Sequence, residues 1–231
     1  MTLPIPLREH IRAVEQAASA SDLLLATRAL AGCLGEATDV AADASALEEA
    51  IATLVQVLGF NNPGAAVAAV DGLIALGSPA VEPLLSRLDP RNYGARAWAV
   101  RALAGIGDVR GLELLEEALA TDVGPSVRRA AACGLGNLRL HTQSAAERLG
   151  IRSRALQALV AGRGDGEWVV RYAVAVGLET LVITMEPLPQ EQVQAVEALA
   201  FLTRAEQEEA AVVRLRASMA LERLRDSPPP S

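Results

Sequence analysis

Aromatic rings and guanidinium groups recur at matching points of a repeated motif, and together they could hold a planar ligand that carries carboxylates. Tyr93 and Trp168 each precede a leucine of the motif by ten residues. Arg129 and Tyr172 share a second position, six residues before that leucine. Aromatic faces offer stacking surfaces, and guanidinium groups bind carboxylates in a bidentate manner. The pattern therefore predicts a binding surface for a large, conjugated molecule with carboxylate groups.

Two further positions strengthen this interpretation. Arg101 and Cys133 both stand two residues before the motif leucine, and Trp98 lies three residues before Arg101. At about 100° per residue, Trp98 and Arg101 point away from the apolar side of their helix, which carries Ala99 and Val100. Only six residues of the chain are aromatic. A tryptophan directed away from the core is an unusual use of such a scarce residue type.

The other reactive residue types exclude several kinds of chemistry. Every one of the 21 basic residues is Arg, so lysine Schiff bases and phosphate-loop lysines are absent from the sequence. Cys33 and Cys133 lie 100 residues apart, and His10 and His141 stand in unrelated contexts. We therefore expect neither a disulfide framework, a metal site nor a Ser-His triad.

Charge and hydropathy limit the partners. The formal net charge is -7 and the isoelectric point is about 5.0. Such an acidic balance argues against nucleic acid or an anionic membrane as a main partner. The sequence has no 18-residue uncharged apolar stretch and begins without a secretory signal, so we expect no membrane insertion and a cytoplasmic location.

The repeat that positions these residues is marked by an Arg seven residues before a Leu. The four complete copies pair Arg96 with Leu103, Arg128 with Leu135, Arg171 with Leu178, and Arg214 with Leu221. Weaker copies without the Arg surround Leu30 and Leu73. The six leucines are spaced by 43, 30, 32, 43 and 43 residues. This range is typical of a solenoid repeat built from two helices.

A second helix is predicted between successive leucines, from apolar residues at helical spacing. The predicted segments are Leu7–Ala18, Leu47–Leu58, Val81–Leu88, Leu112–Leu119, Ser144–Val160 and Glu191–Leu202. The fold class is therefore all-α, an α-solenoid (superhelix) of about six HEAT-like helix pairs. We expect residues 1–225 to form one domain and residues 226–231 to form a disordered, proline-rich tail.

Several candidate residues also have a purely structural interpretation. The Arg of the repeat often bonds an Asp in the next turn in two-helix repeats, and Asp108 could be such a partner; this Arg stands at positions 96, 128, 171 and 214. Trp98 can instead lie buried between helices, and Cys133 can be a small packing residue in an Ala- and Gly-rich helix. The sequence leaves both interpretations open.

One stretch of the chain resembles a known family. Residues 92–108, which include the run Tyr-Gly-Ala-Arg-Ala-Trp, together with residues 126–131 and 134–138, closely resemble the heterodimeric E/F-type phycobilin lyases. The length and tail resemble the smaller, F-type subunit. The resemblance implies an enzyme that joins an open-chain tetrapyrrole, such as phycocyanobilin, through a thioether to a cysteine of a phycobiliprotein subunit. It also implies an E-type lyase subunit as partner.

The resemblance further implies a substrate site without a tightly bound cofactor, because the bilin is the substrate and the client supplies the thiol. Arg101 and Arg129 would hold the bilin propionates, Asp108 would bond the pyrrole nitrogens, and Asp108 and Arg101 are the catalytic candidates. The remaining bilin-binding candidates are Tyr93, Trp98, Trp168 and Tyr172 as ring walls, Arg96 and Arg128 as second choices, and Cys133. Relatives that also isomerise the bilin carry a His-Cys pair near Cys133, where this chain has Ala132.

Two other functions fit the same sequence. A HEAT-repeat adaptor, or a phycobilisome-degradation factor of the same repeat type, would bind antenna proteins without transferring a bilin. A bilin chaperone would bind the pigment but transfer none. A coloured complex would exclude the adaptor, and covalent transfer would separate a lyase from a chaperone.

Overall fold

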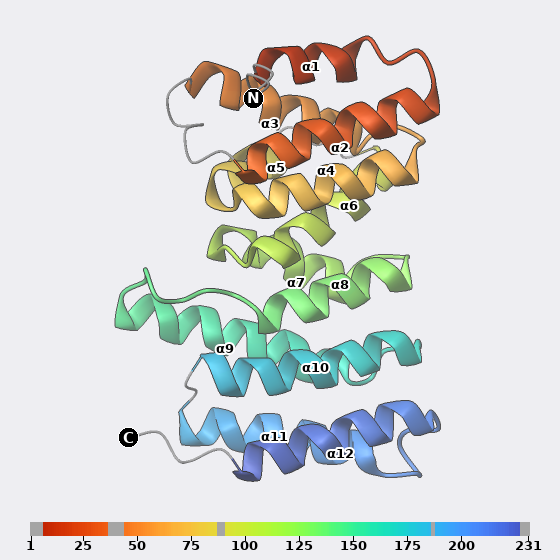
Figure 1. The fold of residues 1–231 in the computed structure, drawn as a ribbon. Coiled ribbons are helices and arrows are strands. Elements are labelled where there is room, and N and C mark those ends of the chain that lie inside the picture. Colours follow the sequence, from red (N-terminus) through yellow and green to blue (C-terminus); the bar gives the residue numbers. More distant parts are fainter. Residues whose placement is uncertain (1–6, 37–43, 87–90, 186–187, 227–231) are drawn as a thin grey trace. The chain divides into compact units, whose positions relative to one another are not determined.

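The fold is built from helices stacked in pairs (Figure 1). The structure is a computed structural model that describes residues 7–36, 44–86, 91–185 and 188–226. Within these ranges it contains twelve α-helices and two short 3-10 segments, and no strand. The prediction of an all-α fold of six helix pairs is confirmed. The Ala- and Leu-rich composition favours this outcome because small and unbranched side chains have high helix propensity.

The chain divides into two compact units, residues 1–106 and 107–231. Unit 1 contains six helices: α1 (Leu7–Glu15), α2 (Ala20–Glu36), α3 (Ala44–Val57), α4 (Pro63–Leu76), α5 (Val81–Ser86) and α6 (Tyr93–Ile106). Asparagine caps join its repeats. Asn62 Oδ1 accepts from the Ala65 amide at the start of α4, while its Nδ2 donates to the Ala20 carbonyl at 2.8 Å. Asn92 caps α6 in the same manner and donates to the Gly59 carbonyl at 3.2 Å.

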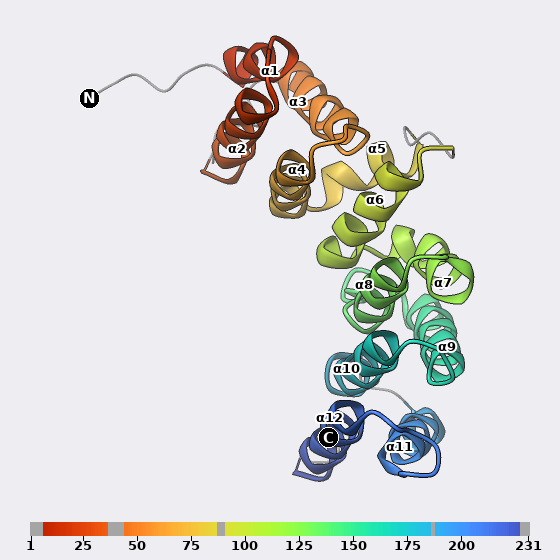
Figure 2. The same cartoon turned by 90° about the vertical axis from the view of Figure 1, so that its right-hand side faces the viewer.

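Unit 2 contains α7 (Leu112–Thr121), α8 (Pro125–Gly136), α9 (Ala145–Gly162), α10 (Trp168–Thr184), α11 (Pro189–Thr203) and α12 (Ala211–Asp226). These helices form two layers, as Figure 2 shows. The first helices of the pairs, α7, α9 and α11, make one layer, and the second helices, α8, α10 and α12, make the other. We call the outer surface of α8, α10 and α12 the second-helix face of unit 2.

The leucines that mark the repeat form the core. Leu30, Leu73, Leu103, Leu135 and Leu178 are each at most 1% exposed. The sixth, Leu221, is half-buried on α12. Since these positions were chosen only from the repeated motif in the sequence, the burial of five of them supports the alignment of the repeats.

The predicted helix limits differ from the structure only at the ends. α1 ends at Glu15 instead of Ala18, because Ser19 already caps α2 by accepting from the Asp22 amide. Ser144 is the N-cap of α9 instead of its first residue. Residue 88, the predicted end of the third of these helices, lies outside the described residues. Of the predicted tail at 226–231, only residue 226 is described, as the last residue of α12.

Candidate functional site

The repeated arginines of unit 2 form a ladder that joins one helix pair to the next. Arg128 donates from Nε and Nη2 to the two carboxylate oxygens of Asp165, at 2.7 and 2.9 Å. Its Nη1 donates to the carbonyl of Asp122 at 2.8 Å. Asp165 in turn accepts from the Glu167 amide ahead of α10. One guanidinium therefore fastens two successive loops.

The next step of the ladder repeats this geometry. Arg171 donates to both carboxylate oxygens of Glu208, with Nη2 at 2.7 Å from Oε1, and to the carbonyl of Asp165 at 2.7 Å. The Glu208 side chain is fully buried. Arg214 donates to the carbonyls of Glu208 and Glu209. Arg128 and Arg171 are thus committed to the fold, in agreement with the structural interpretation of these positions.

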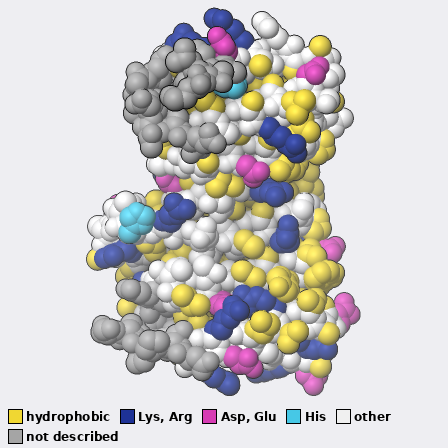
Figure 3. Space-filling view, viewed as in Figure 1, with side chains coloured by type: hydrophobic (Ala, Val, Ile, Leu, Met, Phe, Trp, Pro, Cys, Tyr) yellow, Lys and Arg dark blue, Asp and Glu magenta, His cyan; other side chains and the backbone are white. Residues whose placement is uncertain are grey.

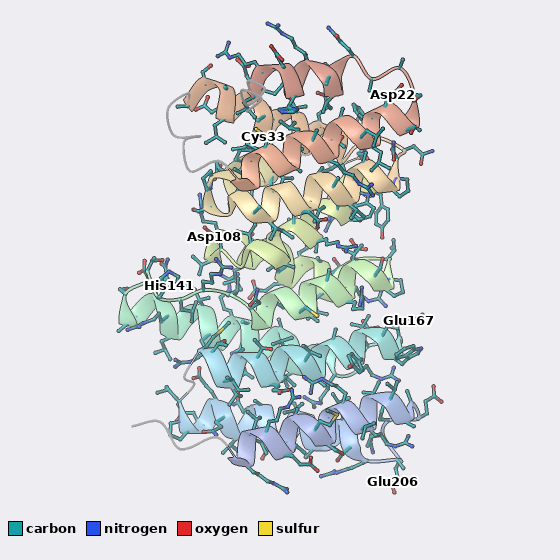
Figure 4. All side chains as sticks on the ribbon, viewed as in Figure 1. Asp22, Cys33, Asp108, His141, Glu167 and Glu206 are labelled. Atoms are coloured by element: carbon teal, nitrogen blue, oxygen red, sulfur yellow. The ribbon has the colours of Figure 1, made fainter. Side chains whose placement is uncertain are left out.

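Asp108 lies apart from the other candidates of unit 2. Its carboxylate caps the 3-10 turn Val109–Gly111 and receives Nε and Nη2 of Arg110 at 2.9 and 2.7 Å. The adjacent carbonyl of Gly107 accepts from the Arg139 amide, beyond the end of α8. Trp168 instead begins α10, at the edge where Arg128 meets Asp165. Asp108 and Glu167, the neighbour of Trp168, mark opposite edges of the unit in Figure 4.

In unit 1, two of the candidate residues on α6 form a cation–π pair. The Arg101 guanidinium lies over the Trp98 ring, 5.7 Å from its centroid. Arg101 is exposed and Trp98 is half-buried, so one part of the Trp98 side chain packs against the protein and another part is accessible to solvent. Tyr93 begins α6 and is 46% exposed. Arg96, five residues before Arg101 on the same helix, is half-buried. The Trp98–Arg101 pair offers both a flat surface and a positive charge.

In unit 2, the second-helix face collects the other candidates. Arg129 and Cys133 lie one turn apart on α8, and both are exposed. Tyr172 is half-buried on α10 and Trp168, at the start of the same helix, is 47% exposed. Figure 3 views this face and shows arginine side chains beside hydrophobic ones. Arg129 and Tyr172 hold the same repeat position on the packed helices α8 and α10, and Cys133 lies one turn from Arg129, so these residues belong to one surface.

Sequence reasoning missed a charged cluster on the same face. Glu179 of α10 is 4% exposed and accepts from Arg216 at Oε2 and from Arg223 at Oε1, the latter at 2.9 Å. Burial alone would raise the pKa of Glu179, but hydrogen bonds from Arg223 and Arg216 and their charges lower it below its usual range. Arg216 stands five residues before Leu221, the repeat position that holds Trp98 in α6. That shared position was the available signal.

Cys133 carries a thiol whose pKa is raised. Loss of hydration is the largest cause, and the charges of Arg129 and Arg216 oppose it without cancelling it. At neutral pH the sulfur is therefore protonated, and it is a poor nucleophile because the thiolate is the reactive form.

We expect this thiol to react slowly with alkylating reagents. In a Cys33→Ser background, iodoacetamide should modify Cys133 more slowly at pH 7.5 than it modifies a small free thiol, because less of Cys133 is ionised. The rate should still be rising at pH values where the small thiol has reached its plateau. The measurement is mass spectrometry of timed samples. Modification faster than that of the small thiol would show an activated cysteine instead.

Two hollows of about 370 and 360 Å³ lie in unit 2, and the first is lined in part by Asp165, Arg171 and Glu208 of the arginine ladder. Both are lined by Arg163 and Phe201, whose guanidinium and ring are 5.2 Å apart. None of the predicted bilin-binding residues lines either hollow. Within the described residues, no group of three or more metal-ligating side chains occurs and no helix is suited to cross a membrane.

Known proteins similar to this chain also consist of HEAT repeats or belong to the phycocyanobilin lyases. Residues 51–136 and 81–179 match the HEAT-repeat family. The phycocyanin alpha phycocyanobilin lyase CpcF of Synechocystis sp. PCC 6803 is 50% identical over 171 residues, which cover 74% of each chain. The phycobilisome maturation protein of Synechococcus elongatus is 51% identical over 75% of this chain and 78% of that protein.

A solved structure extends the match to the fold. A chain from the complex of CpcE and CpcF of phycocyanin lyase from Nostoc sp. PCC7120 has a TM-score of 0.67 and 43% identity. The match covers 74% of this chain and 97% of that one. The stacked helix pairs thus define a HEAT-repeat protein. Within that class, the chain belongs to the family of F-type phycocyanobilin lyase subunits.

Proposed function

We propose that this chain is the F-type subunit of a bilin lyase. The enzyme attaches an open-chain tetrapyrrole, such as phycocyanobilin, through a thioether to a cysteine of a phycobiliprotein subunit. The observation that carries the proposal is the identity of about half of all residues with phycocyanobilin lyase subunits over three quarters of the chain. We further propose an E-type subunit as partner, which the related CpcF has in its solved complex.

The reaction places few chemical demands on the chain. The client's thiol adds to the exocyclic double bond of bilin ring A, so that a carbon–sulfur bond forms and the proton of the thiol passes to the bilin. No tightly bound cofactor takes part in the proposed step, because the bilin is the substrate. The lyase must hold a flexible bilin in one shape and present ring A to the thiol, which lowers the barrier through proximity and orientation.

Two groups of side chains suit this task. Trp98 with Arg101 in unit 1, and Tyr172 with Arg129 in unit 2, each join an aromatic surface to an exposed guanidinium. A ring can stack on the conjugated system and a guanidinium can pair with a propionate, so each unit by itself offers a pair of suitable contacts. Asp108 is held by Arg110 at a different edge of unit 2, so we leave it out of the proposed bilin contacts. We place the reaction in the cytoplasm, where a client cysteine stays reduced.

A transfer assay tests the proposal. The chain, its E-type partner, phycocyanobilin and an apo-phycocyanin subunit are combined, and the covalent product is followed by its fluorescence in a denaturing gel. We expect Trp98→Ala and Arg129→Gln each to lower the transfer rate at least tenfold, because each removes a bilin contact worth about 1.5 kcal/mol.

The matched control is Arg154→Gln on the opposite layer of unit 2. Arg154 forms an exposed ion pair with Glu116, so its loss should leave the rate within twofold of the unmodified chain. Full activity of both test variants would remove the contact assignment. A complex that binds bilin but transfers none would favour a chaperone, and one that binds client protein without bilin would favour an adaptor.

A further inference from the structure

Arg216 has a hydrogen-bonding group that the fold leaves unused. One of its terminal nitrogens, Nη2, donates to Glu179. The other, Nη1, is buried and has no hydrogen-bond partner in the described part of the chain. A guanidinium nitrogen held away from water without an acceptor is unfavourable, and buried polar groups in folded proteins are nearly always paired. The arrangement indicates that an acceptor is missing at this point.

The charges around Arg216 show which acceptor would suit it. Glu179 carries one negative charge and receives both Arg216 and Arg223, so Arg216 is only partly neutralised. Arg129 is exposed on α8, which packs against α10 as α12 does, and it adds a second positive charge to the second-helix face. Two guanidinium groups on one surface, next to a half-buried tyrosine ring, favour an anionic ligand with a flat apolar body.

We propose that Arg216 and Arg129 form a carboxylate-binding pair on the second-helix face of unit 2, with Glu179 as the positioning residue that holds Arg216. The inference rests on the proposed function, and the ligand groups it assigns are the two propionates of the bilin. A propionate would accept from Arg216 Nη1 after a small outward shift of the guanidinium, and a second would pair with Arg129. Tyr172 would then face the pyrrole rings between them.

Glu179 has a distinct part in this arrangement. Its buried carboxylate, shared between Arg216 and Arg223, holds the guanidinium of Arg216 from α12 against α10. The Arg216 side chain therefore does not extend into water. This anchoring limits the movement that the ligand requires of Arg216 to a small shift, so less conformational entropy is lost on binding. If Arg216 served only to pair with Glu179, it would stabilise the fold and bind no ligand. A measurement of ligand binding, separate from folding, distinguishes these two roles.

The test compares the bilin with a form that lacks its negative charges. The complex of this chain with its E-type partner is titrated with phycocyanobilin as the free acid and as the dimethyl ester, and binding is followed by visible absorbance. The unmodified complex should bind the acid at least tenfold more tightly than the ester. Arg216→Gln should weaken binding of the acid about tenfold and change binding of the ester less than twofold.

Two further variants keep the result interpretable. Arg216→Lys retains the charge and the ion pair with Glu179 but loses the forked donor, so we expect an intermediate affinity for the acid in a folded protein. Arg154→Gln, on the other layer, should bind both forms as the unmodified complex does. Helix content from circular dichroism identifies any variant that fails to fold, and the acid-to-ester ratio does not depend on the folded fraction.

The outcomes distinguish this inference from the proposed function. Unchanged affinity for the acid in both Arg216 variants would overturn the carboxylate-binding pair, as would an equal loss for acid and ester. Either result leaves bilin binding by the complex intact and so leaves the proposed function standing. If the unmodified complex binds neither form, the proposed function fails and the inference fails with it.

Discussion

Arg171→Ala is expected to lower the free energy of unfolding of unit 2 by about 3 kcal/mol. The substitution removes both hydrogen bonds to Glu208 and the bond to the Asp165 carbonyl. Glu208 is fully buried, so its carboxylate would stay inside the protein with only the Ala210 amide as a partner among the described contacts. An uncompensated buried charge costs more than the ion pair contributes, which is why loss of one partner has so large an effect.

The effect should depend on pH. Burial alone would raise the pKa of Glu208, but hydrogen bonds from Arg171 and the Ala210 amide, with the charges of Arg171 and Arg214, lower it below its usual range. A lowered pKa in the folded state contributes stability above the unfolded pKa, and that stability is lost as pH falls through the folded pKa. The unmodified chain should therefore lose stability on acidification below about pH 5.

Arg171→Ala loses this contribution already at neutral pH, so the stability gap between variant and unmodified chain should narrow from pH 7 to pH 4. Urea unfolding followed by circular dichroism at both pH values measures the gap. Arg154→Ala, which breaks an exposed ion pair with Glu116, is the control and should cost less than 1 kcal/mol. Equal costs for the two substitutions would show that the ladder adds nothing beyond surface pairing.

The sequence was sufficient to predict the repeat because a leucine at the same position of each copy packs into the core or at its border. Five of the six leucines that mark the repeat are buried, and the six helical segments predicted beside them are all present. Hydrophobic spacing is local and repeats six times, so each copy supports the interpretation of the others. Fold class and helix pairing therefore follow from pattern alone.

The partners of the charged side chains could not be predicted in the same way. Arg128 meets a carboxylate 37 residues further on, and Arg171 meets Glu208 at the same separation. These distances depend on how one helix pair stacks on the next, which local spacing does not encode. Asp108 was assigned to the ligand because a carboxylate would bond the pyrrole nitrogens, yet in the structure its carboxylate caps its own turn. Arg216 was missed because its position holds alanine in the two preceding copies, Ala130 and Ala173.

Gly177→Ala should destabilise unit 2 by about 3 kcal/mol, because the backbones of α8 and α10 pack closely at this residue. A methyl group at Gly177 would stand 2.5 Å from the Ala132 carbonyl oxygen and 2.8 Å from Leu159 Cδ2. The oxygen belongs to the backbone of α8, so relief requires the helices to separate. A side-chain rotation cannot provide it. The same shift would move Arg129 and Tyr172 apart, so transfer activity should fall even where the variant remains folded.

Gly150→Ala is the matched control, since Gly150 lies inside α9, is exposed, and has no atom within 4 Å of the added methyl group. Here the substitution should stabilise the chain by about 0.5–1 kcal/mol, because alanine loses less backbone entropy in a helix than glycine. The same change of residue type thus has opposite expected signs at two helical positions, and thermal unfolding of both variants measures the difference. A stabilising Gly177→Ala would mean that α8 and α10 are not held at this separation. The shared surface of Arg129, Tyr172 and Arg216, which depends on that separation, would then lose its structural basis.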